Sequence, residues 1–414
     1  MMEKKFGLLG RKLSHSFSPQ IHRRLGDYEY LLYETEPEKV EEFVRYAPLD
    51  GFNVTIPYKE TVMPFCTTIS DEAKKIGSVN TVVRRHGRIE GYNTDYFGFT
   101  YLLKNAGIDP AGKKALVLGS GGASKTAQAV LRDLGASCVT VIGRNLPDNY
   151  ENIDKHRDAH IIVNATPVGM YPNNGERIVN LADFPMLEGV ADMIYNPART
   201  AFLLDAERLG VKNTNGLVML VAQAKKAAEI FFETAFDDAL IPRITGEIER
   251  ETKNIALIGM PGCGKSSVGK TIARMTGREL VETDEMIPER AGKSIEDIFR
   301  EDGEDAFRKI ETACLADASK KSGCVIATGG GVVTRPENLD LLRQNSVIVF
   351  IDRDFHEMSV EGRPLSQKYG VQALARARLP LYNSWCDLRI ESAGVKPTAV
   401  EIIRRLGLSS EGKK

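Results

Sequence analysis

The sequence lacks long apolar runs, has almost no net charge and shows no cluster of metal-binding side chains. Within its 414 residues, no apolar run approaches the roughly 18 residues that cross a bilayer. The uncharged stretch FGLLG near the N-terminus is too short for the apolar centre of a secretory signal. The 55 Lys and Arg nearly cancel the 56 Asp and Glu, so no basic field would hold the chain on nucleic acid or anionic lipid. We therefore expect a cytoplasmic protein that binds neither a membrane nor nucleic acid.

The six cysteines lie far apart, with no CxxC pair and no spacing with histidine that is typical of zinc sites. They indicate reduced thiols, most of them buried. His156 and His160 in HRDAH would share one face of a helix, as two metal ligands do, but no third ligand is near them in the sequence. A solvated helix face is therefore favoured over a metal site.

The residues that are present are typical of globular domains. The chain is 42% hydrophobic and 27% charged, and at about 150 residues per domain its length predicts two to three domains. Short apolar runs alternate with helical stretches in both halves, without a repeat of fixed period, which predicts an α/β fold. The charge-dense stretch 243–253 separates two such regions, so we place a domain boundary there.

A first glycine turn, GSGGAS at 119–124, follows an apolar strand and begins a helix. In this context, backbone N–H groups at a helix N-terminus bind a dinucleotide pyrophosphate. The turn is a variant of GxGxxG, because Ser124 stands at the third glycine position. The following strand ends in Gly143 and Arg144 instead of the acid that binds the ribose of NAD. Arg144 favours NADP through its 2′-phosphate, and the alternative is an arginine that only covers apolar surface.

The first hundred residues contain candidate chemistry. SHSFSP at 14–19 offers a dense set of hydroxyl donors for a polyhydroxylated ligand. NVTIPYKE contains Thr55 and Lys59, and GYNTD contains Asn93 and Asp95 at a strand-to-helix turn. If the fold brings Lys59 and Asp95 together, the carboxylate can orient the ammonium group, and the ammonium can protonate an alkoxide as hydride arrives.

The motifs HSFSP, NVTIPYKE, GSVNTV, YNTD, GSGGAS, NATPVGM, DMIYNP and NGLVMLVAQA occur in this order across residues 5–245. In this succession the chain resembles shikimate dehydrogenase. The resemblance implies NADP-dependent reduction of 3-dehydroshikimate to shikimate, with Lys59 and Asp95 as the catalytic pair. It places the substrate at Ser16, Ser18, Thr55, Lys59, Asn80, Asp95, Tyr195 and Gln223, and the cofactor at Gly119, Gly121, Gly122, Ala123, Arg144 and Gly216.

Three positions depart from the pattern of that family. Arg11, Lys12 and Leu13 replace its usual lead-in to the hydroxyl-rich loop. Gly143 precedes Arg144 where the family usually has Asn, which weakens the NADP assignment without reversing it. Tyr96 follows the catalytic Asp where a Gly is usual, and we expect it to crowd the substrate or the nicotinamide.

A second glycine turn, GMPGCGKS at 259–266, fits GxxxxGK[ST] and lies between a strand and a helix. Its N–H groups would cradle phosphates, Lys265 would reach the β- and γ-phosphates, and the Ser266 hydroxyl would bind Mg²⁺. The next strand runs into ETDEMI, which predicts Glu282 and Asp284 on one side, facing the phosphates. Carboxylates there can hold Mg²⁺ or accept a proton from an attacking hydroxyl.

Two further patterns follow the second turn. Arg308 and Glu311 lie one helical turn apart, and this spacing alone favours an exposed surface pair. Three glycines, 329–331, end a strand and would let a small ligand approach the backbone closely.

With RPL at 363–365 and RLPLY at 378–382, these motifs resemble shikimate kinase over residues 254–408. Gluconate kinase and adenylate kinase match less well, because neither accounts for both GGG and RLPLY. The resemblance implies three binding sets. ATP would bind Gly262, Cys263, Gly264, Lys265, Ser266, Ser267 and Arg363, and shikimate would bind Asp284, Arg308, Gly329, Gly330, Gly331 and Arg378. Mg²⁺ would bind Ser266 and Glu282. Lys265 and Asp284 would be catalytic. Two features depart: Glu282 replaces an Asp, and no arginine matches the one that stacks on adenine.

The sequence therefore predicts an α/β chain with a two-lobed N-terminal dehydrogenase, which has a Rossmann NADP lobe, followed by a P-loop kinase domain with a parallel sheet. The expected bounds are 1–103 for the substrate lobe, completed by 217–246, 104–216 for the NADP lobe, 247–253 for a linker and 254–414 for the kinase domain. The expected function is NADPH-dependent formation of shikimate and its phosphorylation by ATP to shikimate 3-phosphate. The alternative is an active shikimate or quinate dehydrogenase whose kinase-like domain only binds ligand or mediates assembly. A homodimer is compatible with the sequence.

Overall fold

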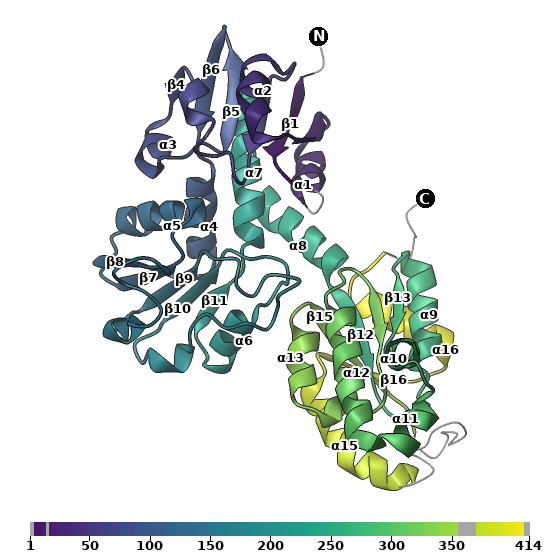
Figure 1. The fold of residues 1–414 in the computed structure, drawn as a ribbon. Coiled ribbons are helices and arrows are strands. Elements are labelled where there is room, and N and C mark those ends of the chain that lie inside the picture. Colours follow the sequence, from purple (N-terminus) through teal and green to yellow (C-terminus); the bar gives the residue numbers. More distant parts are fainter. Residues whose placement is uncertain (1–3, 14–15, 355–369, 410–414) are drawn as a thin grey trace. The chain divides into compact units, whose positions relative to one another are not determined.

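The computed structural model describes residues 4–13, 16–354 and 370–409. The chain divides into two compact units (Figure 1). The first comprises Met1–Val168, Arg177–Tyr195 and Asp205–Gly246, and the second comprises Gly169–Glu176, Asn196–Leu204 and Glu247–Lys414. Two short segments from within the predicted NADP lobe, 169–176 and 196–204, thus group with the second unit. No helix in the described part of the chain is long and apolar enough to span a membrane.

The first sheet of the first unit is mixed. Its strands are β1 (Lys5–Gly10), β2 (Glu29–Glu34), β3 (Gly51–Val54), β4 (Thr68–Ile69), β5 (Thr81–Arg85) and β6 (Arg88–Tyr92), in the order β2-β1-β3-β5-β6-β4. β1 pairs in parallel with β2 and β3, whereas β5 is antiparallel to β3 and β6. The helices α1 (Ser18–Leu25), α2 (Val40–Tyr46) and α3 (Asp71–Ile76) accompany this sheet. The hydroxyl-rich part of the sequence lies in the connection between β1 and α1.

The second sheet of the first unit is parallel, with the order β11-β10-β9-β7-β8. Its strands are β7 (Lys114–Leu118), β8 (Cys138–Ile142), β9 (Ile161–Asn164), β10 (Gly189–Asp192) and β11 (Lys212–Thr214), and helix α5 (Gly122–Asp133) connects β7 to β8. Helix α6 (Ala201–Arg208) lies between β10 and β11 in the chain, and the division between the two units falls within it. Strand, glycine turn, helix and strand follow one another from β7 to β8, as the sequence predicted.

Helix α4 (Asp95–Asn105) lies between the two sheets and crosses α7 (Leu217–Phe232). Phe99, Leu102 and Leu103 of α4 are fully buried in the same apolar cluster as Val117 and Val130 of the second sheet layer. The predicted lobe boundary at residue 103 therefore falls inside a helix that packs against the second sheet and α5.

Gly98 makes the crossing of α4 and α7 close. A Cβ on Gly98 would lie 2.7 Å from the Met219 carbonyl oxygen and 3.0 Å from Gln223 Cβ. Because only glycine leaves room for this approach, the first turn of α4 comes next to Gln223.

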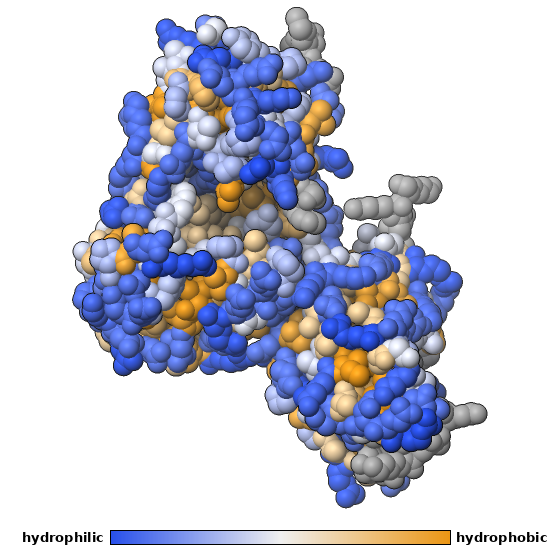
Figure 2. Space-filling model, in the orientation of Figure 1, coloured by the Kyte–Doolittle hydropathy of each residue, from blue (hydrophilic) through white to orange (hydrophobic). Residues whose placement is uncertain are grey.

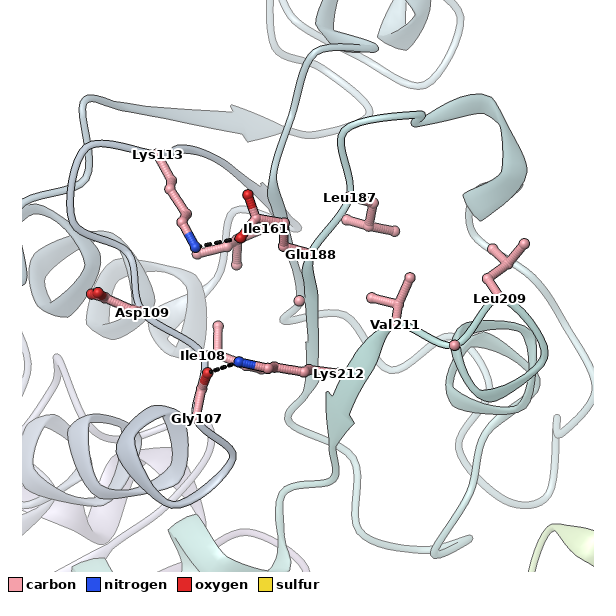
Figure 3. A pocket seen from close by; sticks show the side chains of 12 residues that line it. Gly107, Ile108, Asp109, Lys113, Ile161, Leu187, Glu188, Leu209, Val211 and Lys212 are labelled. Carbon is pink, nitrogen blue, oxygen red and sulfur yellow. Dashed lines mark hydrogen bonds and ion pairs between the residues drawn. The ribbon is translucent and has the colours of Figure 1, made fainter.

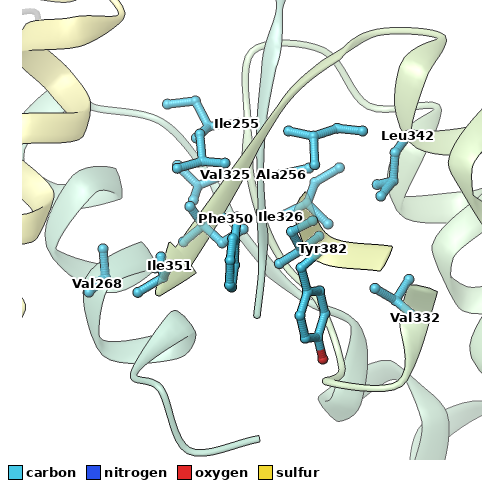
Figure 4. Close-up of a cluster of buried hydrophobic side chains, with 14 of the residues drawn as sticks. Ile255, Ala256, Val268, Val325, Ile326, Val332, Leu342, Phe350, Ile351 and Tyr382 are labelled. Carbon is cyan, nitrogen blue, oxygen red and sulfur yellow. The ribbon is translucent and has the colours of Figure 1, made fainter. Parts of the chain in front are cut away.

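The second unit has a five-stranded parallel sheet with the order β13-β14-β12-β15-β16. Its strands are β12 (Asn254–Ile258), β13 (Leu280–Glu282), β14 (Val325–Ala327), β15 (Ser346–Asp352) and β16 (Leu388–Glu391). Its helices include α9 (Lys265–Thr276), α10 (Thr283–Ala291), α11 (Ile295–Glu301), α12 (Gly303–Ser319), α13 (Glu337–Arg343), α15 (Val371–Trp385) and α16 (Val395–Arg405). Helix α8 (Leu240–Thr252) begins in the first unit and ends in the second. Figure 4 shows side chains from the central strands packing with Val268, Leu342 and Tyr382 in one buried cluster.

The stretch 247–253, expected as a linker, is mostly helical. It forms the end of α8, and only Lys253 separates α8 from β12. Its charge density had indicated a loop, but α8 alternates those charges with the fully buried Ile241, Ile244 and Ile248 at helical spacing.

Candidate active sites

Lys59 and Asp95 meet in the first unit. Lys59 Nζ lies 2.6 Å from Asp95 Oδ2, and the two side chains are 23% and 13% exposed. Lys59 comes from the turn after β3, and Asp95 lies in the first turn of α4, where the helix dipole favours a carboxylate. The partial exposure leaves the ammonium group accessible to a ligand while the carboxylate fixes its orientation.

A network of buried amide and hydroxyl groups begins at Thr94, the residue before Asp95. Asn80 Oδ1 accepts hydrogen bonds from the Thr94 backbone N–H at 2.7 Å and from the Thr81 hydroxyl at 3.1 Å. The Thr94 hydroxyl donates to Gln223 Oε1 at 3.3 Å. Asn80 and Gln223, both predicted as substrate-binding residues, are thus brought together. Thr94, which connects them, was missed, although it stands in the YNTD motif immediately before Asp95.

The hydroxyl-rich loop contributes Ser16 and Ser18. The Ser16 hydroxyl donates to Ser18 Oγ at 3.2 Å, and Ser18 is buried at the start of α1. Thr55 follows β3, and its backbone N–H donates to the Leu9 carbonyl at 2.9 Å. These hydroxyls thus lie where β1 and β3, which are neighbours in the sheet, end.

Tyr195, after β10, faces the first sheet from the second. Its ring lies 5.4 Å from that of Phe17, which belongs to the hydroxyl-rich loop. Burial raises the pKa of the Tyr195 hydroxyl, so this group is a neutral donor. In Figure 2 the surface of the first unit is hollowed between its upper and lower parts. Phe17 was not predicted, because one apolar residue between two serines gives no chemical signal.

The first glycine turn has the geometry that a dinucleotide requires. Gly119 has φ +104°, and a Cβ there would lie 2.9 Å from Thr166 Cγ2, so the position needs glycine. Added Cβ atoms at Gly121 and Gly122 would meet nothing within 4 Å, which leaves the N-terminus of α5 open. Ala123 is exposed there. The turn therefore fits a pyrophosphate group on backbone N–H donors.

Arg144 and Gly216 complete the predicted cofactor positions. Arg144 is exposed directly after β8, where a ribose phosphate would be accessible to it. Gly216 precedes α7, and its N–H donates to the Ile194 carbonyl at 3.0 Å. A Cβ on Gly216 would lie 2.2 Å from the Met193 carbonyl oxygen, so the start of α7 packs on the loop that carries Tyr195.

Tyr96 does not point where the sequence had suggested. Its hydroxyl donates to Asp133 Oδ2 at 2.8 Å, at the end of α5, and its ring packs on the apolar cluster of the second sheet. The expected crowding of the substrate or nicotinamide is replaced by a contact with the helix that starts at the glycine turn.

The second glycine turn wraps around Lys265. Gly259, Gly262 and Gly264 all have positive φ, and the Lys265 ammonium donates to the carbonyls of Gly259 at 2.9 Å and Met260 at 3.1 Å. Such a loop presents its N–H groups to phosphate with a lysine at its centre, so it fits a nucleotide.

The remaining residues of this turn divide between its inside and its outside. The thiol of Cys263 is buried against Gly259, whereas Ser266 and Ser267 are exposed in the first turn of α9. A cavity of about 420 Å³ opens beside the loop. It is lined by Met260, Asp352, Arg353, Asp354, Leu379, Glu391 and Ser392.

Glu282 ends β13 beside the loop. Its carboxylate lies 3.1 Å from Lys270 Nζ. Burial raises the pKa of Glu282, but hydrogen bonds from Ser266 and Lys270 outweigh burial and leave the pKa below its usual range. The two predicted Mg²⁺ ligands are therefore together, with the carboxylate ionised, and the donor set fits a hard cation.

Asp284 lies in a helix and not, as predicted, on the strand with Glu282. β13 ends at Glu282, and Asp284 is in the first turn of α10. The prediction assumed that the strand continues through Asp284, but β13 stops at Glu282 and the chain turns into α10 at Thr283. Burial raises the pKa of Asp284, opposed by the charges of Lys265 and Arg308.

The three glycines that follow β14 lie against Asp284, Glu311 and Arg308. A Cβ on Gly329 would lie 2.5 Å from Glu311 Oε1 and 2.7 Å from Asp284 Oδ1, and a Cβ on Gly331 would lie 1.9 Å from Arg308 Nη1. The strand end thus presents bare backbone to two carboxylates and a guanidinium. Glu311 was missed as a site residue, because its spacing to Arg308 favoured an exposed pair, whereas both side chains are buried.

Arg378 and Tyr382 of α15 hold the same glycine strand end. Arg378 Nη1 donates to the Gly330 carbonyl at 3.2 Å, and the Tyr382 hydroxyl donates to the same oxygen. Arg378 is buried, so the structure places two predicted anion-binding arginines, 308 and 378, at one carboxyl edge of the sheet. Arg363, the third predicted arginine, lies outside the described residues.

Other candidates lie elsewhere. His156 Nε2 pairs with Asp148 at 2.9 Å at the end of a short 3₁₀ helix, and His160 accepts from the Lys114 N–H. Of the cysteines, 263, 314 and 324 are buried, 138 is exposed, and 66 and 386 are intermediate.

A cavity of about 350 Å³ lies at the edge of the second sheet where β7, β10 and β11 begin (Figure 3). There, Lys113 pairs with Glu188 at 2.5 Å, and Lys212 donates to the Gly107 carbonyl at 2.8 Å. This cavity contains none of the predicted site residues, because they gather where the strands end.

Family models match both halves of the chain. The model "Shikimate dehydrogenase substrate binding domain" matches residues 8–82, and the model "Shikimate kinase" matches residues 261–406. The shikimate dehydrogenase (NADP(+)) of Clostridium beijerinckii is 39% identical over 268 residues, which cover 60% of this chain and 99% of that protein. The shikimate dehydrogenase (NADP(+)) of Methanopyrus kandleri is 38% identical over 54% of this chain and 89% of its own length.

Solved structures show the same likeness. Shikimate dehydrogenase 1 from Peptoclostridium difficile matches with a TM-score of 0.55 and 40% identity, over 59% of this chain and 97% of that one. Shikimate 5-dehydrogenase from Thermus thermophilus, solved with NADP(H) and shikimate, matches with a TM-score of 0.55 and 30% identity, over 59% of this chain and 99% of that one.

Proposed function

The chain belongs to the shikimate dehydrogenase family and carries a shikimate kinase domain, and from this premise we propose that its two sites perform consecutive steps. The first reduces 3-dehydroshikimate with NADPH, and the second transfers a phosphoryl group from ATP to the shikimate formed. The observation that supports this most is the presence, in one chain, of a Lys–Asp pair beside an open dinucleotide turn and of an Asp–Arg cluster beside a phosphate loop. The product of the first site is the substrate of the second.

In the dehydrogenase site, Lys59 is the proton donor. The carbonyl oxygen of the substrate becomes an alkoxide during reduction, and the Lys59 ammonium group donates a proton to it. Asp95 holds the ammonium group in place at 2.6 Å. The first glycine turn would hold NADPH, which would supply the hydride.

The substrate's polar groups have donors on both sides of the hollow. The hydroxyls of Ser16 and Ser18 donate hydrogen bonds to the carboxylate of the substrate. Asn80, Thr55 and Gln223 bind its hydroxyl groups. Tyr195 covers the ring from the second sheet, where its neutral hydroxyl is a further donor.

In the kinase site, Asp284 accepts the proton of the shikimate hydroxyl that attacks the phosphoryl group. Arg308 and Arg378 bind the substrate carboxylate, and the 329–331 backbone supports the ring. Lys265 neutralises charge on the transferring phosphoryl group, since phosphoryl transfer depends mainly on positioning and charge.

Magnesium and the nucleoside of ATP have matching residues. Ser266 and Glu282 would hold Mg²⁺, which would supply positive charge to neutralise the phosphates. The cavity of about 420 Å³ beside the loop is the place for the nucleoside. The homodimer and the cytoplasmic location stay predictions from the sequence.

The alternative, a kinase-like domain that only binds ligand, is not favoured. Lys265, Asp284, Arg308 and Arg378 all stand at the carboxyl edge of one sheet, as turnover requires. A coupled assay tests the proposal: with 3-dehydroshikimate, NADPH, ATP and Mg²⁺, NADPH loss and ADP formation are followed together. We expect one ADP for each NADPH oxidised. NADPH oxidation without ADP would support the alternative, and the absence of both would refute the proposal.

A further inference from the structure

One carboxylate at the end of α5 joins three helices of the first unit. Asp133 Oδ2 accepts from the Tyr96 hydroxyl at 2.8 Å, and Asp133 Oδ1 pairs with Lys75. Lys75 belongs to α3, Tyr96 to α4 and Asp133 to α5. Hydrogen bonds from Lys75 and then Tyr96 lower the pKa of the Asp133 carboxyl. These partners are needed, because the last residue of a helix is an unfavourable place for negative charge.

Tyr96 is built to be the donor in this contact. Its ring is partly buried against the apolar cluster that contains Phe99 and Val130. Burial, together with the neighbouring carboxylate, raises the pKa of Tyr96 to about 12, so the hydroxyl keeps its proton. Tyr96 directly follows the catalytic Asp95, and α5 is the helix that starts at the dinucleotide turn.

A second contact runs from the other catalytic residue to the same helix. Glu60 directly follows Lys59, and its carboxylate lies 2.7 Å from Lys125 Nζ, near the start of α5. The two side chains are 58% and 40% exposed, so this ion pair is weak and screened by salt. The residues that follow Lys59 and Asp95 are therefore both linked to α5, and the Tyr96 contact, although also near solvent, is the one accompanied by apolar packing of its ring.

We propose that Tyr96, acting through Asp133, is a positioning residue for hydride transfer, and this rests on the proposed dehydrogenase function. The Tyr96–Asp133 hydrogen bond fixes the first turn of α4, which carries Asp95, relative to α5, whose N-terminus would receive the cofactor. The Lys–Asp pair and the cofactor approach the substrate from different elements, so their alignment depends on how α4 sits on α5, to which the Tyr96–Asp133 hydrogen bond adds a directional contact beside the apolar packing of Phe99 and Val130. A displacement of about 1 Å at a distance from the reacting atoms costs roughly 100-fold in rate.

The test is Tyr96→Phe in the full chain, because it removes only the hydroxyl. We expect kcat for NADPH oxidation to fall about tenfold, with KM for 3-dehydroshikimate and Kd for NADPH changed less than about twofold, since alignment is lost and ground-state binding is not. The primary isotope effect with deuterated NADPH should rise as hydride transfer becomes slower. Tyr101→Phe, on the same helix, is the matched control and should leave these values unchanged. A urea transition of the first unit at the wild-type midpoint reports that this unit is folded.

Asp133→Asn and the double variant show whether the effect passes through the proposed contact. If it does, the double variant is no slower than the more impaired single variant, whereas independent effects multiply and would overturn the proposal.

Hydrogen exchange provides a readout that does not depend on substrate. Amides of residues 93–98 and 120–125 should exchange faster in Tyr96→Phe than in the wild type or Tyr101→Phe. Unchanged exchange would refute a positioning role of the Tyr96–Asp133 hydrogen bond, even if the wild-type enzyme is active. Absence of NADPH oxidation by the wild type would instead refute the proposed function, with the role of this hydrogen bond still decided by exchange.

Discussion

Arg308 and Glu311 of α12 form an ion pair in the interior of the second unit. Nη1 and Oε2 are 2.6 Å apart, and the side chains are 6% and 2% exposed. In the part of the chain that the structure describes, Glu311 Oε1 has no hydrogen-bond partner, although it lies close to the Gly329 backbone. Burial raises the pKa of Glu311, opposed by Arg308. A pair desolvated to this degree holds the arginine in one orientation toward the strand end.

Removal of Glu311 should therefore damage both stability and shikimate binding. Glu311→Ala removes the buried partner of Arg308 and leaves the guanidinium the more exposed Glu304 at 3.3 Å, so we expect a loss of up to about 3–5 kcal/mol. We expect the kinase unit to unfold at lower urea and KM for shikimate to rise at least tenfold. Glu311→Gln keeps the shape and one hydrogen bond and should be affected less. If both variants keep the wild-type KM, the pair does not orient Arg308.

Lys59→Ala should separate the two activities. Loss of the proton donor should lower kcat for 3-dehydroshikimate reduction by about 10²–10⁴. ADP release that depends on added shikimate should stay at the wild-type rate, because Lys265 and Asp284 are in the other unit.

Asp284→Asn is the converse variant, with intact NADPH oxidation and a kinase rate lowered by at least 100-fold. A folded variant that loses both activities would contradict independent sites.

Arg144→Ala should weaken the choice of NADP over NAD. Arg144 is the exposed cation at the end of β8, so its loss should raise KM for NADPH at least tenfold and change KM for NADH less than about twofold. Steady-state rates with both cofactors measure this directly. Equal changes for the two cofactors would show that Arg144 does not bind the 2′-phosphate.

His22 should make the substrate lobe sensitive to acid. Its ring stacks on Tyr30 at 3.7 Å, and Nδ1 is 2.6 Å from the Tyr28 hydroxyl. Burial lowers the pKa of His22 from 6.5 to about 3. Between these values the unfolded chain binds a proton that the folded chain does not, so stability is lost as pH falls, by about 1.4 kcal/mol per unit.

Urea unfolding of the full chain at pH 7, 6 and 5 measures this loss. His22→Phe keeps a stacked ring and cannot titrate, so its first-unit transition should lose the part of the pH slope that His22 supplies. An identical slope in wild type and variant would exclude His22 as the cause.

The two glycine turns, whose strand–turn–helix context the sequence predicted, have strict local requirements. A phosphate loop needs glycine at positive φ and a lysine at a fixed place, and the 259–266 turn shows both. The turn at 119–124 likewise follows a strand and opens a helix, so its pattern was readable without tertiary information. The pairing of Lys59 with Asp95 was predicted as a chemical option and is present in the fold.

What the sequence could not give depends on packing between distant elements. The burial of Glu311 is decided by β14 and α10, not by its spacing to Arg308. The direction of Tyr96 is decided by Asp133, which is 37 residues away. Thr94 was overlooked because a threonine before an aspartate is common at helix starts, and only Asn80 and Gln223 together give it a role.

The three consecutive glycines, 329–331, each meet a different neighbour. A methyl group would strike Glu311 and Asp284 at the first, Pro261 of the phosphate loop at 2.6 Å at the second, and Arg308 at the third. A compound that rested on this main chain would contact a surface that single amino-acid changes cannot reshape without harming the enzyme. Resistance to such an inhibitor would have to arise elsewhere in the protein.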